Sequence, residues 1–362
     1  MTNSGRLGRR LLRRVVRIVP SRSETGRGTT RHVPSVDGGE WRATERDLER
    51  GNVAAADRSS ADLYERHPDI PRVLALRAKV LGRLGDLEEE ARVLHRLHAL
   101  DDRAETRAWE RRVLGRLIVS RPGWLPPVGT SVEPPDPAER VVLFLAAESA
   151  PHRSSVVTEA LASRVRAARQ EGLQPVVVTA LGFPRRVGRQ SVQRIEIVDE
   201  VQHHRLDLGQ FYRLDAPIDI VLSDGAWLTA RVARAVRPAL LHVVAGEGTI
   251  AEALVALALR ELLARPLVYD VVASSANDRR PIGEVDRRRL EAERFALARA
   301  DHVLTGSAAA RDSLIERGLD GGRVGIIAES GANGTRGSEG RALRVAYERA
   351  QASRFAAVPA GA

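Results

Sequence analysis

The sequence contains no cysteine, and Lys79 is the only lysine among its 57 basic residues. The absence of cysteine excludes disulfides and thiolate metal sites, and it fits a reducing cytoplasm. The almost exclusive use of arginine, with abundant Ala, Val and Gly, is typical of GC-rich bacteria and does not by itself indicate phosphate binding. Nine histidines occur, but the pairs His95/His98 and His203/His204 come without a third ligand. We therefore expect no metal ion, and no cofactor motif is evident.

Long apolar runs are also missing, since none reaches the roughly 18 residues that a membrane-spanning helix needs. The net charge of +10 is concentrated near the start of the chain, where residues 1–31 hold nine arginines and one acid. The rest of the chain is nearly neutral, which argues against a nucleic-acid partner.

Residues 6–19 predict an amphipathic helix that ends at Pro20. At about 100° per residue, its apolar side chains share one half-circle and its arginines fill the other. This pattern is typical of a helix lying in an anionic membrane surface, so we expect a cytoplasmic protein, peripheral at the inner face of the membrane. A basic tail, or a helix that packs on the protein itself, remains the alternative. The membrane-contact candidates are Arg6, Arg9, Arg10, Leu11, Arg13, Arg14, Val15 and Arg17.

A linker completes the first segment, 1–39, and residues 40–120 then predict a helical domain. Two of its segments align at a spacing of 34 residues, with Gly51-Asn52-Val53 opposite Gly85-Asp86-Leu87. The text from Leu84 to Asp102 resembles the turn and second helix of a tetratricopeptide repeat. The resemblance implies a protein partner bound by the helices, while an ordinary helical hairpin packed on the next domain remains open.

Six prolines in residues 121–138 predict a stiff linker. Beyond it, apolar runs alternate with amphipathic segments, which predicts a Rossmann-like α/β domain over 139–335 with a parallel sheet buried on both faces. Residues 336–362 predict a last helix and tail, with the helix packing back on this domain. The expected strands are 141–146, 175–180, 194–201, 218–224, 240–246, 266–273, 302–307 and 324–330. The expected helices are 154–171, 226–236, 248–264, 284–300, 308–317 and 338–353.

Three blocks of this domain resemble the acceptor half of bacterial family-4 glycosyltransferases, which are retaining enzymes of the two-domain GT-B fold. The first combines the loop Glu148–Ser155, a helix, Gly172, a strand and Gly182-Phe183-Pro184. The second is Pro266-Leu267-Val268-Tyr269-Asp270-Val271, similar to the family's Pro-x-Val-Tyr-Glu-Val. The third runs from Glu291 to Gly318 and then from Val324 to Gly331. The resemblance covers about half of the chain and implies an N-terminal GT-B domain.

The chain departs from the family's pattern at several places. Ser154-Ser155-Val156-Val157 stands where the family usually has glycines, Val272-Ala273 replaces Arg-Gly, and Glu329-Ser330-Gly331 replaces Pro-Asn-Gly. Only 31 residues follow Gly331, so the nucleotide-sugar donor domain of the family is not expected here. Apolar residues in a loop that faces a phosphate remove hydrogen-bond donors, and the loss of such donors costs binding energy.

These features favour a glycosyltransferase-like protein that lacks the donor domain. It would be a non-catalytic or partner-dependent subunit in cell-envelope polysaccharide or glycoconjugate synthesis. An active retaining hexosyltransferase completed by a separate or truncated donor domain remains an alternative, as does a helical-repeat adaptor, so enzymatic activity is left open. A sugar acceptor is the ligand that the resemblance implies. Ligands of open α/β sheets sit outside the carboxyl ends of the strands, so the acceptor-binding candidates are His152, Arg153, Ser154, Ser155, Glu247 and Asp270. No catalytic residue is assigned.

Overall fold

The structure is a computed structural model that describes residues 38–129, 136–188, 193–209, 215–246, 249–272, 284–327 and 338–356. The chain separates into residues 1–38 and residues 39–362. The predicted membrane-surface helix 6–19 lies outside the described residues and stays a prediction. Among the helices that are described, none is long and apolar enough to cross a membrane.

The region from 40 to 120 is helical, as predicted. Gly51 and Gly85 both adopt φ +80° in the turns that precede α3 and α5, a conformation that favours glycine. Asp86 caps α5 by accepting a hydrogen bond from the Glu89 amide. The membership of the tetratricopeptide family stays a prediction. The helices are α2 (Gly38–Glu49), α3 (Val53–Arg66), α4 (Pro71–Leu84), α5 (Leu87–Leu100) and α6 (Ala104–Val119).

The second part of the chain contains an eight-stranded sheet in the order β3-β4-β2-β1-β5-β6-β7-β8. Every neighbouring pair is parallel except β3 and β4, which are antiparallel. The predicted α/β fold class with a parallel sheet is therefore confirmed. The strands are β1 (Ala138–Ala146), β2 (Gln174–Thr179), β3 (Ile195–Val198), β4 (Val201–Arg205), β5 (Pro238–Gly246), β6 (Leu267–Val272), β7 (His302–Thr305) and β8 (Val324–Ile326).

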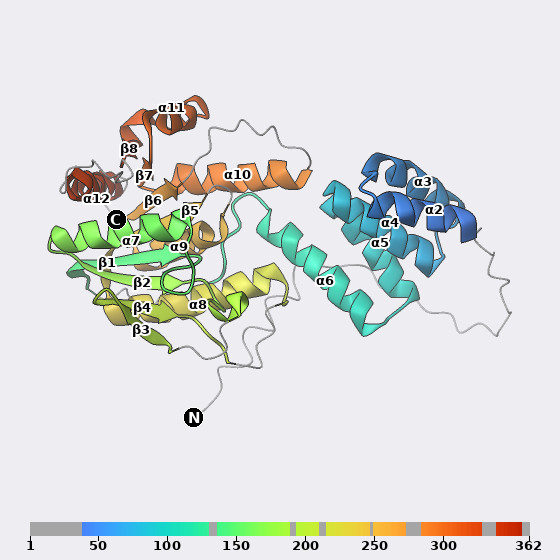
Figure 1. Cartoon of the computed structure of the whole chain (residues 1–362), viewed down its shortest axis with the longest axis horizontal. Coiled ribbons are helices and arrows are strands. Elements are labelled where there is room, and N and C mark those ends of the chain that lie inside the picture. The colour runs from blue at the N-terminus through green and yellow to red at the C-terminus, as the bar shows by residue number, and fades with distance from the viewer. Residues whose placement is uncertain are drawn as a thin grey trace. The chain divides into compact units, whose positions relative to one another are not determined.

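Helices cover both faces of this sheet (Figure 1). Successive side chains of a strand point to opposite faces, so Leu143 and Leu145 of β1 enter one core and Val142 and Phe144 enter the other. The first core is closed mainly by α8 (Ile218–Val236), α9 (Ala251–Leu263) and α10 (Glu284–Arg299), with Leu314 of α11 (Ala308–Glu316). The second core is closed by α7 (Val156–Gln170) and α12 (Ser338–Ala356). The buried runs that predicted the strands thus pack on both sides.

The last helix, α12, packs back on the sheet domain, as predicted. Leu343, Ala346, Tyr347 and Ala350 are buried in the same core as α7. Polar contacts reinforce the packing, since Ser163 of α7 donates a hydrogen bond of 2.7 Å to Glu339. Helix α12 is therefore part of the α/β domain although it follows the eighth strand.

Two predicted strands were wrong. The segment 194–201 is not one strand but a hairpin, because Asp199 and Glu200 take φ +48° and +65° and reverse the chain between β3 and β4. The segment 218–224 forms the first two turns of α8, which begins after Pro217. Its apolar run does not distinguish a buried strand from a buried helix by pattern alone.

The helical region contacts the sheet domain through α6 and α8. Arg111 of α6 donates a hydrogen bond of 2.9 Å to Asp219 in the first turn of α8, where a carboxylate is favoured by the helix dipole. Trp124, Leu125 and Val128 of the proline-rich segment also pack against the first core. This segment is thus in contact with the sheet domain.

Candidate functional site

The loop after β1 and the first turn of α7 lie at the carboxyl edge of the sheet. Ser155 caps α7, accepting from the Thr158 amide at 3.3 Å, while Thr158 Oγ1 accepts from the Ser155 amide at 2.8 Å. This reciprocal capping box satisfies two amide donors that an anionic ligand would otherwise find at a helix N-terminus. Ser155, and not the neighbouring Ser154, is therefore the capping residue.

The other loop candidates also have protein partners. Nε2 of His152 lies 3.0 Å from Glu196 Oε2, and only 15% of the His152 side chain is exposed. The Ser154 hydroxyl donates to Glu159 at 3.2 Å. Arg153 forms an ion pair with Glu148 at 3.3 Å and remains half-exposed. His152, Arg153, Ser154 and Ser155 therefore lie together, but carboxylates accompany three of them.

Arg205, at the end of β4, holds this loop through hydrogen bonds. It was not identified as a site residue from the sequence. Its guanidinium donates to Glu196 at 2.7 Å and to the Ala150 carbonyl at 2.9 Å, and it also contacts the Ser149 hydroxyl. Burial alone would raise the pKa of Glu196, but hydrogen bonds from Arg205 and His152 and their charges lower it. The sequence did contain a signal for this contact. His203 and Arg205 are two residues apart on β4, so their side chains lie on the same face of the sheet.

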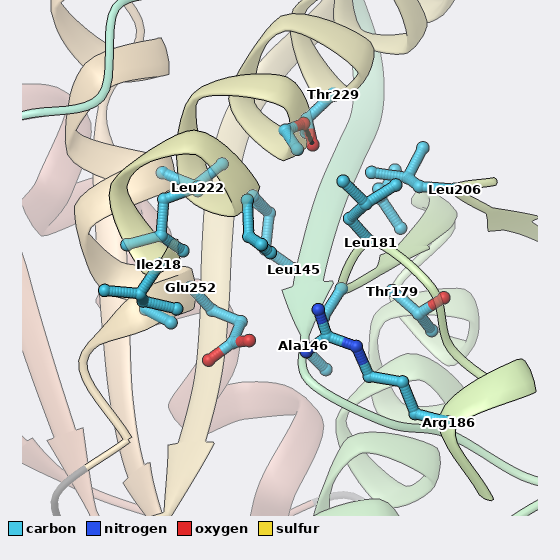
Figure 2. A pocket seen from close by; sticks show the side chains of 16 residues that line it. Leu145, Ala146, Thr179, Leu181, Arg186, Leu206, Ile218, Leu222, Thr229 and Glu252 are labelled. Atoms are coloured by element: carbon cyan, nitrogen blue, oxygen red, sulfur yellow. Dashed lines mark hydrogen bonds between the residues drawn. The ribbon is translucent and has the colours of Figure 1, made fainter. Parts of the chain in front are cut away.

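A cavity of about 70 Å³ opens at the same edge, on the face covered by α8 and α9. Leu145, Val178 and Leu222 contribute to its apolar wall. Figure 2 shows the Glu252 carboxylate and the Arg186 guanidinium facing one another beside Ala146, where β1 ends. An apolar cavity with a few convergent polar groups is the usual form of a small-molecule site. We call it the edge pocket.

Glu252, which the sequence did not single out, is the perturbed group of the edge pocket. Burial raises its pKa from the ordinary 4.5 to about 7, although the charge of Arg186 acts in the opposite direction. Its Oε2 atom has no hydrogen-bond partner within the described ranges. A carboxyl group that titrates near neutral pH can both accept and donate a proton, and such groups cluster at functional sites.

The structure separates Asp270 from the other candidates. Asp270 lies on β6 in the core closed by α7 and α12, where it accepts a hydrogen bond of 2.7 Å from Arg164. The sequence showed no charge partner for it, because Arg164 lies 106 positions away. Asp270 thus belongs to a buried ion pair that holds helices on the sheet. Glu247 lies outside the described residues.

The site offers hydrogen bonding and one neutral-pH carboxyl group. Within the described ranges, no group of three or more His, Asp or Glu side chains is placed to hold a metal ion. The chemistry available from the described side chains is therefore binding and proton transfer.

Three solved structures are similar to this chain over part of its length. The structure is similar to sucrose-phosphate synthase from Thermosynechococcus elongatus, with 15% identity, 59% of this chain and 98% of that chain covered, and a TM-score of 0.40. A lipopolysaccharide outer core galactosyltransferase matches with 9% identity, 54% and 47% coverage of the two chains, and a TM-score of 0.37. The O-GlcNAc transferase of Thermobaculum terrenum matches with 13% identity, 81% and 74% coverage, and a TM-score of 0.23.

No curated protein matches the chain in sequence. A family model does match: that of the glycosyl transferase 4-like domain aligns with residues 140–328, more than half of the chain. The matched range begins in β1 and ends just after β8, so it covers the whole sheet. The chain therefore belongs to the glycosyl transferase 4-like domain family.

Proposed function

We propose that this chain is a glycosyltransferase-like subunit that binds a sugar-bearing acceptor and does not hold a nucleotide-sugar by itself. It would act without catalysis, or only with a partner, in the synthesis of cell-envelope polysaccharide or glycoconjugate. Membership of the glycosyl transferase 4-like family supports the substrate class.

The observation that carries the proposal is the state of the α7 N-terminus. A diphosphate would need free amide donors and preorganised positive charge at this place. Instead, the capping box of Ser155 and Thr158 occupies two donors, and Glu148 and Glu159 flank the loop. Arg153 and Arg205 are the neighbouring cations, and their charges are balanced by Glu148 and Glu196. The positive charges beside this helix end are thus already paired with carboxylates, which weakens its ability to stabilise a doubly charged leaving group.

The edge pocket is the part of the domain suited to an acceptor. At about 70 Å³ it is smaller than a typical small-molecule site of roughly 300 Å³ or more, so it can hold a substituent or one edge of a sugar ring, while Arg186 and Glu252 offer hydrogen bonds to hydroxyl groups. His152 lies on the loop above β1, where it can add a further contact if its hydrogen bond to Glu196 exchanges.

Calorimetry of the purified chain with uridine, guanosine and adenosine diphosphate sugars tests this proposal. We expect no measurable binding and no hydrolysis of any of them. Micromolar binding of a single member of the panel would contradict the proposal, and variants of His152, Arg153 and Ser154 would then locate the site. The change Arg112→Gln, an exposed site on α6, controls for loss of one positive charge.

A second candidate function is an active retaining hexosyltransferase completed by a separate donor domain. The pKa of Glu252 near 7 favours it, because a group of that kind can exchange a proton with an acceptor hydroxyl. In that case hexosyl transfer appears only after a donor-domain protein is added, and Glu252→Gln slows it. A transfer rate unchanged by this substitution would remove Glu252 from the reaction.

Two further roles rest on the sequence pattern. We propose that residues 6–19 recruit the cytoplasmic protein to anionic membrane, and that the helical region 40–120 binds a protein partner or serves as an adaptor. Six arginines on one half of the predicted helix support the first role. The 34-residue repeat supports the second.

A further inference from the structure

A second and larger cavity, of about 310 Å³, lies on the opposite face of the sheet from the edge pocket. It is bounded by α7, by the loop after β1 and by the β3–β4 turn, and we call it the α7 cavity. Leu161 and Val165 of α7 form its apolar side. Its volume is at the lower end of the range typical of small-molecule sites.

The polar end of the α7 cavity is built from buried side chains. His203 Nδ1 lies 3.0 Å from Ser149 Oγ, and Arg205 also donates to that hydroxyl. Ser149 and His203 are 1% and 5% exposed, and both line the cavity. Burial, and then the charge of Arg205, lower the pKa of His203 to about 4, so the ring is neutral at physiological pH.

A neutral imidazole with Nδ1 engaged by Ser149 leaves Nε2 for a ligand. In one tautomer Nε2 donates a hydrogen bond, and in the other it accepts one. A ligand hydroxyl can both donate and accept, so it matches this nitrogen whichever tautomer is present. The polar end of the cavity is therefore well matched to a hydroxyl group.

The charged residues of the cavity wall carry a net positive charge. The side chain of Arg166 of α7 is exposed and forms no hydrogen bond or ion pair with any other described residue. Arg169 is already paired with Glu200. Asp199, in the β3–β4 turn, also lines the cavity, and its carboxylate can accept hydrogen bonds from further hydroxyls. Arg166 is the group left to bind an anion.

We propose that the α7 cavity binds a small phosphorylated polyol or sugar. A hydroxyl contacts His203, the carbon skeleton lies against Leu161 and Val165, and the phosphate pairs with Arg166. An arginine matches a phosphate well, because its planar guanidinium offers two parallel donors. This site does not depend on nucleotide-sugar chemistry at the carboxyl edge, so it stands apart from the proposed function.

Isothermal titration calorimetry of the full chain, near neutral pH and at low salt, tests the proposal with glycerol 3-phosphate and glucose 6-phosphate. Glycerol, glucose and inorganic phosphate separate the contributions of the hydroxyl groups and of the anion. We expect one of the two phosphorylated probes to bind at least about tenfold more tightly than its uncharged counterpart and than phosphate.

Two variants locate the binding. Arg166→Gln should weaken it about tenfold by removing the charged partner, and Ala162→Phe should abolish it by filling the cavity that Ala162 lines. Arg112→Gln is the matched control and should change nothing. Because Arg166 is exposed, its variant decides the question even if Ala162→Phe fails to fold. Binding that is equal in wild type and Arg166→Gln, or no binding of either phosphorylated probe below about 10 mM, would overturn the proposal.

Discussion

Replacing Glu252 by glutamine should stabilise the protein, and the gain should grow with pH. Glu252 is 8% exposed, and burial raises the pKa of its carboxyl from 4.5 to about 7. A raised carboxyl pKa means that the folded state binds the proton more tightly than the unfolded state. Stability is therefore lost as pH rises from about 4.5 to about 7, and above that range the folded protein carries the full cost of a buried carboxylate.

The size of this cost follows from the two pKa values. One pKa unit corresponds to about 1.4 kcal/mol, so the difference between 4.5 and about 7 amounts to about 3 kcal/mol. Glutamine has nearly the same shape and no charge at any pH, so its own burial adds only a constant. Between pH 5 and pH 8.5, the advantage of Glu252→Gln over wild type should increase by about 2–3 kcal/mol.

Urea unfolding at both pH values, followed by circular dichroism, measures this difference directly. The matched control is Glu316→Gln, which removes the same charge from an exposed site on α11. Its effect should be small and nearly independent of pH. An equal stability difference at pH 5 and pH 8.5 for Glu252→Gln would refute the reasoning, because it would mean that the carboxylate is solvated in the folded protein.

Three further outcomes are expected. Arg164→Met leaves the buried carboxylate of Asp270 and that of Glu339 without their shared arginine and should lower the free energy of unfolding, measured in urea, by about 3–5 kcal/mol. Combining it with Asp270→Leu and Glu339→Gln should recover much of the loss, and a triple variant as unstable as the single one would contradict this. In the Glu252→Gln variant, which lacks the opposite pH dependence of Glu252, acidification from pH 6.5 to pH 4 should destabilise the protein, because burial lowers the pKa of His203 and of His302 to about 4 while the unfolded chain takes up protons near 6.5. Adding His302→Gln should flatten this dependence in thermal melts, and an unchanged slope would count against it. Removal of residues 1–20 should reduce co-sedimentation with anionic vesicles in a salt-sensitive way, and equal sedimentation of both proteins would rule out the membrane role.

Much of the fold could be read from local patterns. The strands β1, β2, β5, β6 and β7 were predicted because their apolar runs are continuous, as expected for strands of a sheet covered on both faces. The last helix was predicted with Leu343, Val345, Ala346 and Ala350 as its apolar positions. Three of these side chains are buried against the domain, whereas Val345 is exposed. Where the burial of a segment follows from its own residues, the sequence was sufficient.

The wrong predictions concern segments whose local pattern is compatible with two different secondary structures. The run after Pro217 is as apolar as a buried strand, yet it forms the start of helix α8, and the strand beside β1 is β5. The hairpin between β3 and β4 needs Asp199 and Glu200 at positive φ, which is uncommon for residues other than glycine and is not evident from their identity.

The candidate site divides in the same way. The sequence determined that the loop from His152 to Ser155 follows the first strand and opens a helix, because both elements are encoded locally. Only the tertiary structure decided which charges meet: Arg205 with Glu196, Arg164 with Asp270, and Arg186 with Glu252 across the edge pocket. The pKa of a carboxyl group depends on burial and on charges that arrive from distant parts of the chain. Secondary structure reflects the periodicity of neighbouring residues, whereas the electrostatics of a site exist only once the chain has folded.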